Sequence, residues 1–163
     1  RLIFLNGFSK AWSMTGFRLG YACAPAPLID AMMKIHQYGM MCASSISQTA
    51  GLEALRHGDA AIAEMRDAYH LRRNFIVASL NEMGLDCFMP RGAFYVFPSI
   101  QSTGLSSKEF ALRLLNECNV ACVPGEAFGA CGEGFLRCSY ATGMTQLKEA
   151  MERMEKFVSA LVR

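Results

Sequence analysis

Hydrophobic and polar positions follow two periods along this chain, one typical of helices and one typical of short buried strands. Helical spacing is clearest from residue 59 to residue 83, where apolar side chains recur at steps of three, four or seven. These side chains are Ile62, Met65, Tyr69, Ile76, Leu80 and Met83. Asp59 is a suitable N-cap and Gly84 a suitable residue to end the helix. The pattern therefore predicts one long helix of about 37 Å, at ~1.5 Å per residue.

Four other segments predict helices. Two of them run from Pro27 to about Tyr38 and from Gln48 to Leu55, and a proline is accepted in a first turn. The letters SSKE at 106–109 are a capping box, which opens a third helix. Its shared apolar face is Phe110, Leu114 and Cys118. A stripe from Thr145 onward is typical of an amphipathic helix packed on a sheet. The stripe consists of Leu147, Met151, Met154, Val158 and Leu161.

Short apolar or aromatic runs between these helices predict strands. The runs are RLIFL (1–5), FRLGYACA (17–24), AFYVFP (93–98), VACV (120–123) and GFLRCSYA (134–141). Strands and helices alternate after the long helix, which predicts a compact α/β domain, whereas residues 1–45 resemble the edge of another domain. The glycine-rich stretch at 124–134 lacks the G-K-[ST] ending of a phosphate-binding loop, so we expect an irregular connector there.

Composition excludes several classes of partner. Sixteen basic and fourteen acidic side chains are interleaved and give a formal net charge of +2, so neither a nucleic-acid arm nor a polybasic membrane patch is expected. No apolar run approaches the length of a membrane span. The 52% apolar content is high for a free-standing domain, which favours a surface that faces a partner. Because the sequence opens inside a strand and without Met, we expect a piece of a longer protein.

Neither cysteines nor histidines predict a metal site or a disulfide framework. The seven cysteines are odd in number and lack paired C-x-x-C spacing, which favours reduced thiols in a cytoplasmic protein. The three histidines share no metal-ligand spacing. They are His36, His57 and His70.

The loop around Lys10 contains the most informative chemistry. Small and hydroxyl-bearing residues surround this lysine, and Arg18 follows eight positions later. A lysine in a loop is usually a solvated surface charge. However, Arg18 is expected inside an apolar strand, where an unpaired guanidinium is costly and an anion such as phosphate would satisfy it. A desolvated lysine beside a cation is a nucleophile toward carbonyls, so the combination suggests pyridoxal phosphate.

The motif GFSKAWSMTGFRLG (7–20) resembles the lysine-attachment signature of class I and II pyridoxal-phosphate-dependent aminotransferases, of the aspartate and aromatic aminotransferase type. Gly7, Ser9, Lys10 and Arg18 match that signature. Three later segments resemble the family in the same order, so the resemblance covers essentially the whole chain. They are KIHQYGMMCASSISQTAGLEAL (34–55), RGAFYVFP (91–98) and VPGEAFGACGEGFLRCSYA (123–141).

The resemblance implies roles for four residues. Lys10 would form the Schiff base with the cofactor and shuttle the proton, Arg18 would pair with the cofactor phosphate, and Ser9 would add a contact. Arg137 would bind the substrate α-carboxylate. This role agrees with the position of Arg137 inside the apolar run 134–141, where a carboxylate would repay the burial of a guanidinium, although pairing with an internal acid is the alternative.

The resemblance also implies the α/β fold of type I pyridoxal-phosphate-dependent transferases. Residues 1–45 would end the large cofactor-binding domain, residues 46–84 would form connecting helices, and residues 85–163 would form the small carboxy-terminal α/β domain. The parent enzyme would be a cytoplasmic homodimer that acts on amino acids and 2-oxo acids, with residues 38–47 near the neighbouring subunit.

The family also uses a carboxylate upstream of the lysine to keep the pyridine nitrogen protonated. The first acidic residue here is Asp30, which follows Lys10, so we expect little turnover from these 163 residues alone. Two alternatives remain open for the parent: a lyase or synthase of the same fold, and an aminotransferase-like effector domain of a transcription regulator.

Overall fold

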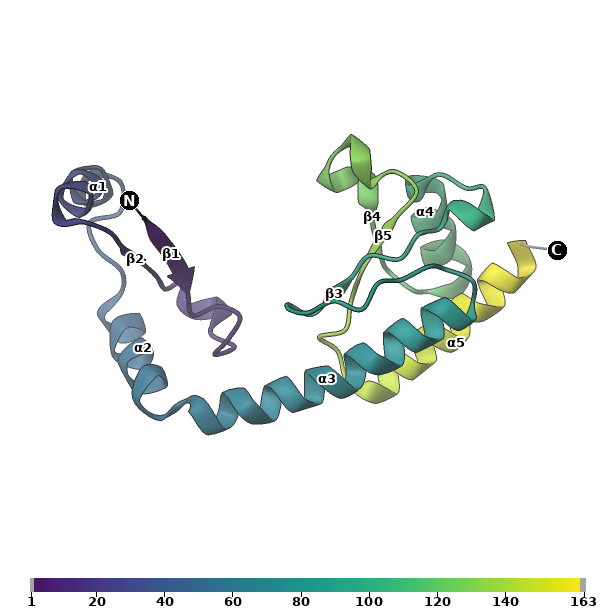
Figure 1. Cartoon of the computed structure of the whole chain (residues 1–163), viewed down its shortest axis with the longest axis horizontal. Helices are drawn as coiled ribbons and strands as arrows, with labels where there is room; N and C mark the ends of the chain where they lie inside the picture. Colours follow the sequence, from purple (N-terminus) through teal and green to yellow (C-terminus); the bar gives the residue numbers. More distant parts are fainter. Residues whose placement is uncertain (1, 162–163) are drawn as a thin grey trace. The chain divides into compact units, whose positions relative to one another are not determined.

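The structure of the chain is a computed structural model that describes residues 2–161. It divides into two compact units, Arg1–Arg66 and Asp67–Arg163, and the boundary falls within one helix, α3 (Figure 1). Each unit has its own short-stranded sheet and its own helices, so each is described separately.

The first unit consists of a β-hairpin followed by two helices. Strands β1 (Phe4–Gly7) and β2 (Gly20–Cys23) are antiparallel, and they are joined by a loop that contains a short 3₁₀ helix, η1 (Thr15–Phe17). Helices α1 (Ala26–Gly39) and α2 (Ser45–His57) follow. Both expected helices are confirmed, and α2 is longer at each end than its apolar spacing indicated.

The hairpin loop packs against α2 through its aromatic residues. Phe8 and Met14 are buried, and the ring centroids of Phe8 and Trp12 lie 4.9 Å apart. The indole Nε1 of Trp12 donates a hydrogen bond to the carbonyl of Ala54 in α2 at 3.2 Å. Gly51 in α2 lets this contact form, because a Cβ there would meet the side chain of Leu19 at 2.5 Å. The loop is therefore held against a helix and is not a free surface turn.

Helix α3 (Asp59–Glu82) confirms the long helix expected from residue 59 to residue 83. Asp59 was expected to cap it but is the first helical residue. The carbonyl of Gly58 accepts the first helical hydrogen bond, from the amide of Ile62 at 3.0 Å. Gly84 follows the helix with a φ of +78°, as a terminating glycine should. Burial on this helix is concentrated near its end, at Ile76, Val77 and Leu80.

The second unit has a three-stranded antiparallel sheet in the order β3-β5-β4. The strands are β3 (Tyr95–Val96), β4 (Val123–Pro124) and β5 (Leu136–Ser139). All three are shorter than the apolar runs that predicted them. Helices α4 (Ser107–Cys118) and α5 (Met144–Leu161) confirm the remaining two helices. The side chain of Ser106 accepts a hydrogen bond from the amide of Glu109 at 3.2 Å, as the capping box requires.

The core of the second unit lies between its sheet and its helices. Helix α5 runs beside the end of α3, and residues of both helices line one shallow hollow (Figure 1). Eleven hydrophobic side chains of this unit are wholly or almost wholly buried, and they come from its helices, its strands and its connecting segments. Those at 2% exposure or less are Ile76, Leu80, Leu85, Val96, Ile100, Phe110, Leu114, Leu136, Tyr140, Leu147 and Met154. Among residues 2–161, no helix has the length and apolar character needed to cross a membrane.

Candidate functional site

Lys10 and Ser9 lie where strand β1 leaves the hairpin. The last paired residues are Gly7 and Gly20, and the amide of Phe8 still donates to the carbonyl of Leu19 at 3.1 Å. The chain then turns, with the amide of Ser13 donating to the carbonyl of Lys10 at 3.4 Å. Ser9 is partly buried and Lys10 is exposed. The amine of Lys10 therefore stands on an anchored turn.

Arg18 occupies the other side of the same loop, two residues before β2. We expected it inside an apolar strand, and this was wrong: Arg18 is exposed and caps η1 with a left-handed φ of 52°. Its guanidinium NH1 donates to the carbonyl of Thr15 at 3.0 Å, which supports this uncommon backbone conformation. Lys10 and Arg18 thus flank the same end of one hairpin, because Phe8 and Leu19 are bonded across it.

Ser9, Lys10 and Arg18 lie on the same loop, and their side chains are of the types that can bind an anion that also carries a carbonyl. A guanidinium and a hydroxyl bind phosphate oxygens through charge-assisted hydrogen bonds, and an amine attacks a carbonyl. Within the described part of the chain, Arg18 forms no ion pair with a carboxylate. An incoming anion would therefore meet no competing internal acid at this guanidinium.

Arg137 lies in β5 of the second unit, between two aromatic rings. Its guanidinium carbon is 4.7 Å from the ring centroid of Tyr95 and 4.7 Å from that of Phe128. Arg137 is partly buried, and among residues 2–161 it has no carboxylate partner, so the alternative of an internal acid is not what this structure shows. Cation–π contacts offset the burial of the charge, and the two rings restrict the movement of the guanidinium.

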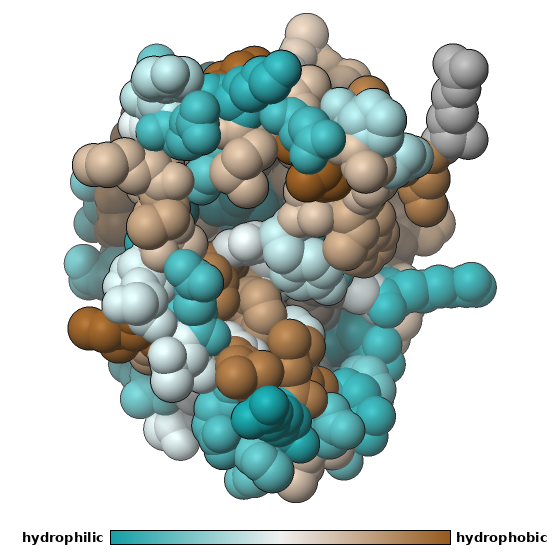
Figure 2. Space-filling model, turned by 90° about the vertical axis from the view of Figure 1, so that its left-hand side faces the viewer, coloured by the Kyte–Doolittle hydropathy of each residue, from teal (hydrophilic) through white to brown (hydrophobic). Residues whose placement is uncertain are grey.

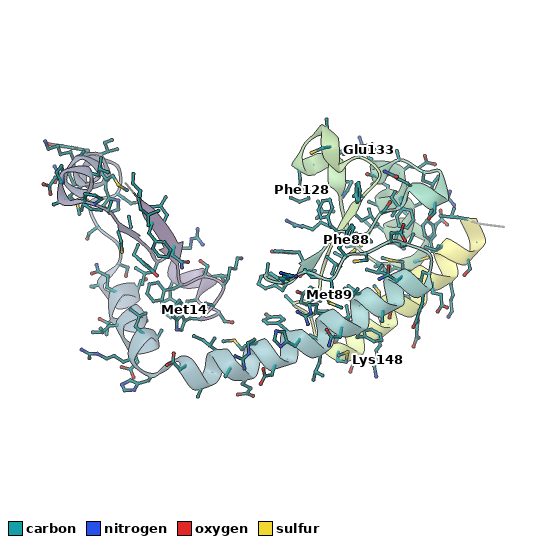
Figure 3. All side chains as sticks on the ribbon, in the orientation of Figure 1. Met14, Phe88, Met89, Phe128, Glu133 and Lys148 are labelled. Carbon is teal, nitrogen blue, oxygen red and sulfur yellow. The ribbon has the colours of Figure 1, made fainter. Side chains whose placement is uncertain are left out.

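Phe128 belongs to the connector between β4 and β5, labelled in Figure 3 at Phe128 and Glu133. This connector is irregular, as expected, and consists of two 3₁₀ turns, η3 (Gly125–Phe128) and η4 (Ala130–Gly132). Gly125 and Gly132 touch backbone to backbone, and a Cβ at either would collide with the other's carbonyl oxygen. The two glycines therefore fix the path of the loop that carries Phe128.

The start of helix α4 anchors the same connector. The buried hydroxyl of Ser107 accepts hydrogen bonds from the amides of Gly134 at 2.8 Å and Phe135 at 3.2 Å. In return, the amide of Ser107 donates to the carboxylate of Glu133 at 2.9 Å. This bond lowers the pKa of Glu133, while a hydrogen bond with Glu133 raises the pKa of Glu126.

The sequence did not single out Tyr95, Phe128 or Ser107 as site residues. Tyr95 stands in the aromatic run AFYVFP, which signalled a strand but not a partner for an arginine. Phe128 and Ser107 reach Arg137 and its loop only through contacts between segments distant in sequence. The single local signal was the repeated glycine of the connector.

Known proteins resemble this chain over most of its length. The model of the aminotransferase class I and II family matches residues 1–154. The aspartate aminotransferase of Pyrococcus abyssi is 50% identical over 96% of this chain, and aromatic-amino-acid aminotransferase 2 of Thermococcus litoralis is 49% identical over 96%. In both cases the match spans 41% of the relative's length.

A solved structure agrees with these sequence matches. The crystal structure of an aromatic aminotransferase from Pyrococcus horikoshii superposes with a TM-score of 0.93 at 48% identity, and the match covers 97% of this chain and 43% of that one. The expected α/β fold of type I transferases is thereby confirmed for these residues. The chain belongs to the aminotransferase class I and II family.

Proposed function

We propose that this chain is the part of a pyridoxal-phosphate-dependent aminotransferase that carries the cofactor lysine. The whole enzyme would transfer an amino group between an L-amino acid and a 2-oxo acid. The observation that carries the proposal is the placement of Ser9, Lys10 and Arg18 around one end of a single hairpin, in a chain of this family. The named relatives favour an aminotransferase over a lyase, a synthase or the effector domain of a regulator.

The residues of the hairpin fit the cofactor. Arg18 lacks a carboxylate partner within the described residues and uses one guanidinium donor for Thr15, so its other N–H groups suit phosphate oxygens. The hydroxyl of Ser9 lies in the same loop, and the exposed amine of Lys10 suits a carbonyl. Pyridoxal phosphate combines the two groups that this donor set would recognise.

Each residue would have one task in the reaction. When bound, the cofactor supplies an electron sink for the charge left by the departing α-proton. Nζ of Lys10 would hold the cofactor until the amino group of the substrate displaces it, and the freed amine would then take that proton and return it one step later. Arg18 and Ser9 would fix the phosphate, and Arg137 would bind the α-carboxylate along the edge of its guanidinium. The rings of Tyr95 and Phe128 would keep that edge in place.

We further propose that the complete enzyme includes residues beyond this chain and is a cytoplasmic homodimer. The chain matches only 41% of the length of these relatives, which supports the proposal that the complete enzyme is longer. The first unit also exposes many large apolar side chains, and Figure 2 shows brown, hydrophobic side chains open to solvent on the face turned to the viewer. The most exposed of them are Leu2, Leu5, Ile35, Tyr38, Met40, Met41 and Ile46. Such surfaces usually pack against a partner or a further part of the chain. The seven cysteines are all free, which suits a reducing compartment.

Reductive trapping tests the cofactor site. The complete enzyme would be mixed with pyridoxal phosphate, reduced with borohydride and mapped by peptide mass. We expect one major adduct on Lys10, which is lost in Lys10→Ala and retained in the control Lys34→Ala, an exposed lysine of α1. Arg18→Ala should weaken cofactor binding at least about tenfold, because a charged hydrogen bond contributes roughly 1.5–3 kcal/mol. An adduct spread evenly over surface lysines would contradict the assignment.

A second experiment tests the substrate arginine separately. Arg137→Gln should raise the KM for the 2-oxo acid at least about tenfold, since a charge-assisted bidentate contact is lost. Arg113→Gln is the matched control, because Arg113 is an arginine of α4 that pairs with Glu117 on the helix surface. Equal effects of the two changes would remove Arg137 from the proposed site and leave the cofactor assignment intact.

A further inference from the structure

Two cysteines meet across the sheet of the second unit. The sulfur atoms of Cys122 and Cys138 are 3.5 Å apart. The ladder between β4 and β5 pairs Val123 with Arg137 and Pro124 with Leu136, and the same register places Cys122 directly opposite Cys138. The contact is therefore set by strand pairing, in a chain where the other cysteines form no comparable sulfur contact within the described residues.

The position of this pair in the alternation of hydrogen-bonded and non-hydrogen-bonded pairs along the two strands makes it suitable for a covalent bond. The amide of Gly125 donates to the carbonyl of Phe135 at 2.8 Å, which makes that pair a hydrogen-bonded one. Alternation along an antiparallel ladder then makes Cys122 and Cys138 a non-hydrogen-bonded pair, in which Cα atoms are about 4.5 Å apart. Disulfides span Cα distances of about 4.4–6.8 Å. Bonding requires the two sulfur atoms to approach to about 2.05 Å, which side-chain rotation supplies.

A small oxidant can reach this pair of cysteines, and the two thiols differ in how readily they ionise. A cavity of about 370 Å³ opens on both cysteines and is lined by residues of α5 that include Arg153. Cys122 is partly buried and Cys138 is buried. The hydrogen bond between the two thiols lowers the pKa of Cys122 and, with burial, raises the pKa of Cys138 well above its usual value. Cys122 is therefore the more readily ionised and the more accessible of the two thiols, so a small oxidant meets it first.

We propose that Cys122 and Cys138 form a thiol-oxidation site that closes to a disulfide when the protein meets hydrogen peroxide. The thiolate of Cys122 attacks one peroxide oxygen, the O–O bond breaks, and a sulfenic acid forms as hydroxide leaves and takes a proton. The sulfur of Cys138 then attacks the sulfenic sulfur, and the hydroxyl leaves as water with the proton of Cys138. Two thiols and one peroxide give one disulfide and two waters.

The disulfide would tie down the loop that carries Phe128. Residues 122–138 contain the whole connector from β4 to β5, and the bond would close that segment into a ring. Neighbouring residues of a strand point to opposite faces, so the bond lies on the face away from Arg137, while the ring it closes contains both Phe128 and Arg137. Closing a loop of this size restrains the unfolded chain, and we expect the thermal midpoint to rise by at least about 4 °C.

Peptide mapping of the whole protein tests the site. The reduced protein would be treated with hydrogen peroxide, its remaining thiols alkylated, and the product cleaved with trypsin. Cleavage after Arg113, Arg137 and Lys148 puts the two cysteines on separate peptides, 114–137 and 138–148. We expect these peptides to be joined and two hydrogen atoms lighter than their sum, with fragmentation placing the bond on Cys122. Dithiothreitol should separate them.

Single substitutions make the result decisive. Cys122→Ser should abolish the joined peptides and the rise in thermal midpoint, whereas Cys118→Ser, which alters a neighbouring cysteine of the same peptide, should leave both unchanged. Alkylation of the exposed Cys131 should fall in every sample, which shows that the oxidant acted. A bond from Cys138 to Cys87, Cys118 or Cys131 would overturn the proposal. So would an unbonded Cys122–Cys138 pair in a sample whose Cys131 is oxidised.

Discussion

Ser107→Ala tests how the connector that carries Phe128 is held. The hydroxyl of Ser107 is wholly buried at the start of α4 and accepts hydrogen bonds from two backbone amides of the connector. Alanine keeps the helix and the volume almost unchanged but removes the acceptor. The two amides then lose different amounts, because their remaining partners differ.

The structure gives the size of each loss. The amide of Phe135 also donates to the carbonyl of Gly132 at 3.2 Å, so it keeps a partner and loses roughly 0.5–1 kcal/mol. The amide of Gly134 is buried and also interacts with the carboxylate of Glu133, but its 2.8 Å bond to Ser107 is lost, so its loss is at most that of an unsatisfied buried donor, about 1–3 kcal/mol. We expect the free energy of unfolding to fall by about 1.5–4 kcal/mol in total.

Urea unfolding followed by far-ultraviolet circular dichroism measures this loss, since most of the helix lies in α3, α4 and α5. Ser159→Ala, the same chemical change on an exposed face of α5, should alter the free energy by less than about 0.5 kcal/mol. Hydrogen exchange at Gly134 should accelerate in Ser107→Ala alone. A loss no larger than that of Ser159→Ala, with unchanged exchange at Gly134, would refute the reasoning.

Three further changes have expected outcomes. Leu80→Ala, at a wholly buried position of α3, should lower the free energy of unfolding by about 2–5 kcal/mol. Leu71→Ala changes a side chain of the same helix that is 67% exposed, so its loss should be far smaller. Urea titration compares the two variants, and similar losses would contradict the described core. Burial raises the pKa of Tyr140, so the folded state keeps a proton that the unfolded chain loses near pH 10. The free energy of unfolding should therefore fall as the pH rises past about 9–10. Tyr140→Phe should make that fall smaller, which thermal midpoints measured between about pH 8 and 11 would show. Phe128→Ala should raise the KM for a 2-oxo acid roughly two- to fivefold, because about 0.5–1 kcal/mol of cation–π energy is lost. Phe88→Ala, which changes a side chain that is 93% exposed, should leave the KM unchanged. Equal KM values for the two variants would contradict a role of Phe128 beside Arg137.

Local periodicity predicted the helices well and the strands less well. A helix forms hydrogen bonds within its own segment, so the spacing of apolar residues and the caps at Ser106 and Gly84 were enough to place α3, α4 and α5. A strand extends only as far as it pairs with a neighbouring strand, which its own sequence does not reveal. The run 93–98 therefore yielded only Tyr95–Val96 as β3, because its pairing with β5 determines the bounds.

In the candidate site too, residues of a contiguous motif were predicted from the sequence, whereas residues joined by tertiary contacts were not. The motif around Lys10 is contiguous in sequence, so Ser9, Lys10 and Arg18 were predicted together, but the conformation predicted for Arg18 was wrong. Its neighbours are apolar, and the local pattern did not reveal the left-handed turn that removes it from β2. The surroundings of Arg137 depend on contacts between distant segments. No spacing rule joins Tyr95 to Phe128, so the stack became visible only in three dimensions.

That stack restricts the shape of any anion that Arg137 accepts. The ring centroids of Tyr95 and Phe128 each lie 4.7 Å from the guanidinium carbon, so we expect a ligand to approach along the edge that the rings leave open, where N–H donors are parallel and coplanar. A flat carboxylate matches that edge with two oxygens. A tetrahedral sulfonate or phosphonate directs its third oxygen out of the plane, toward a ring. Selection between acids of equal charge would then follow from the geometry of the anion itself, before the rest of the ligand makes any contact.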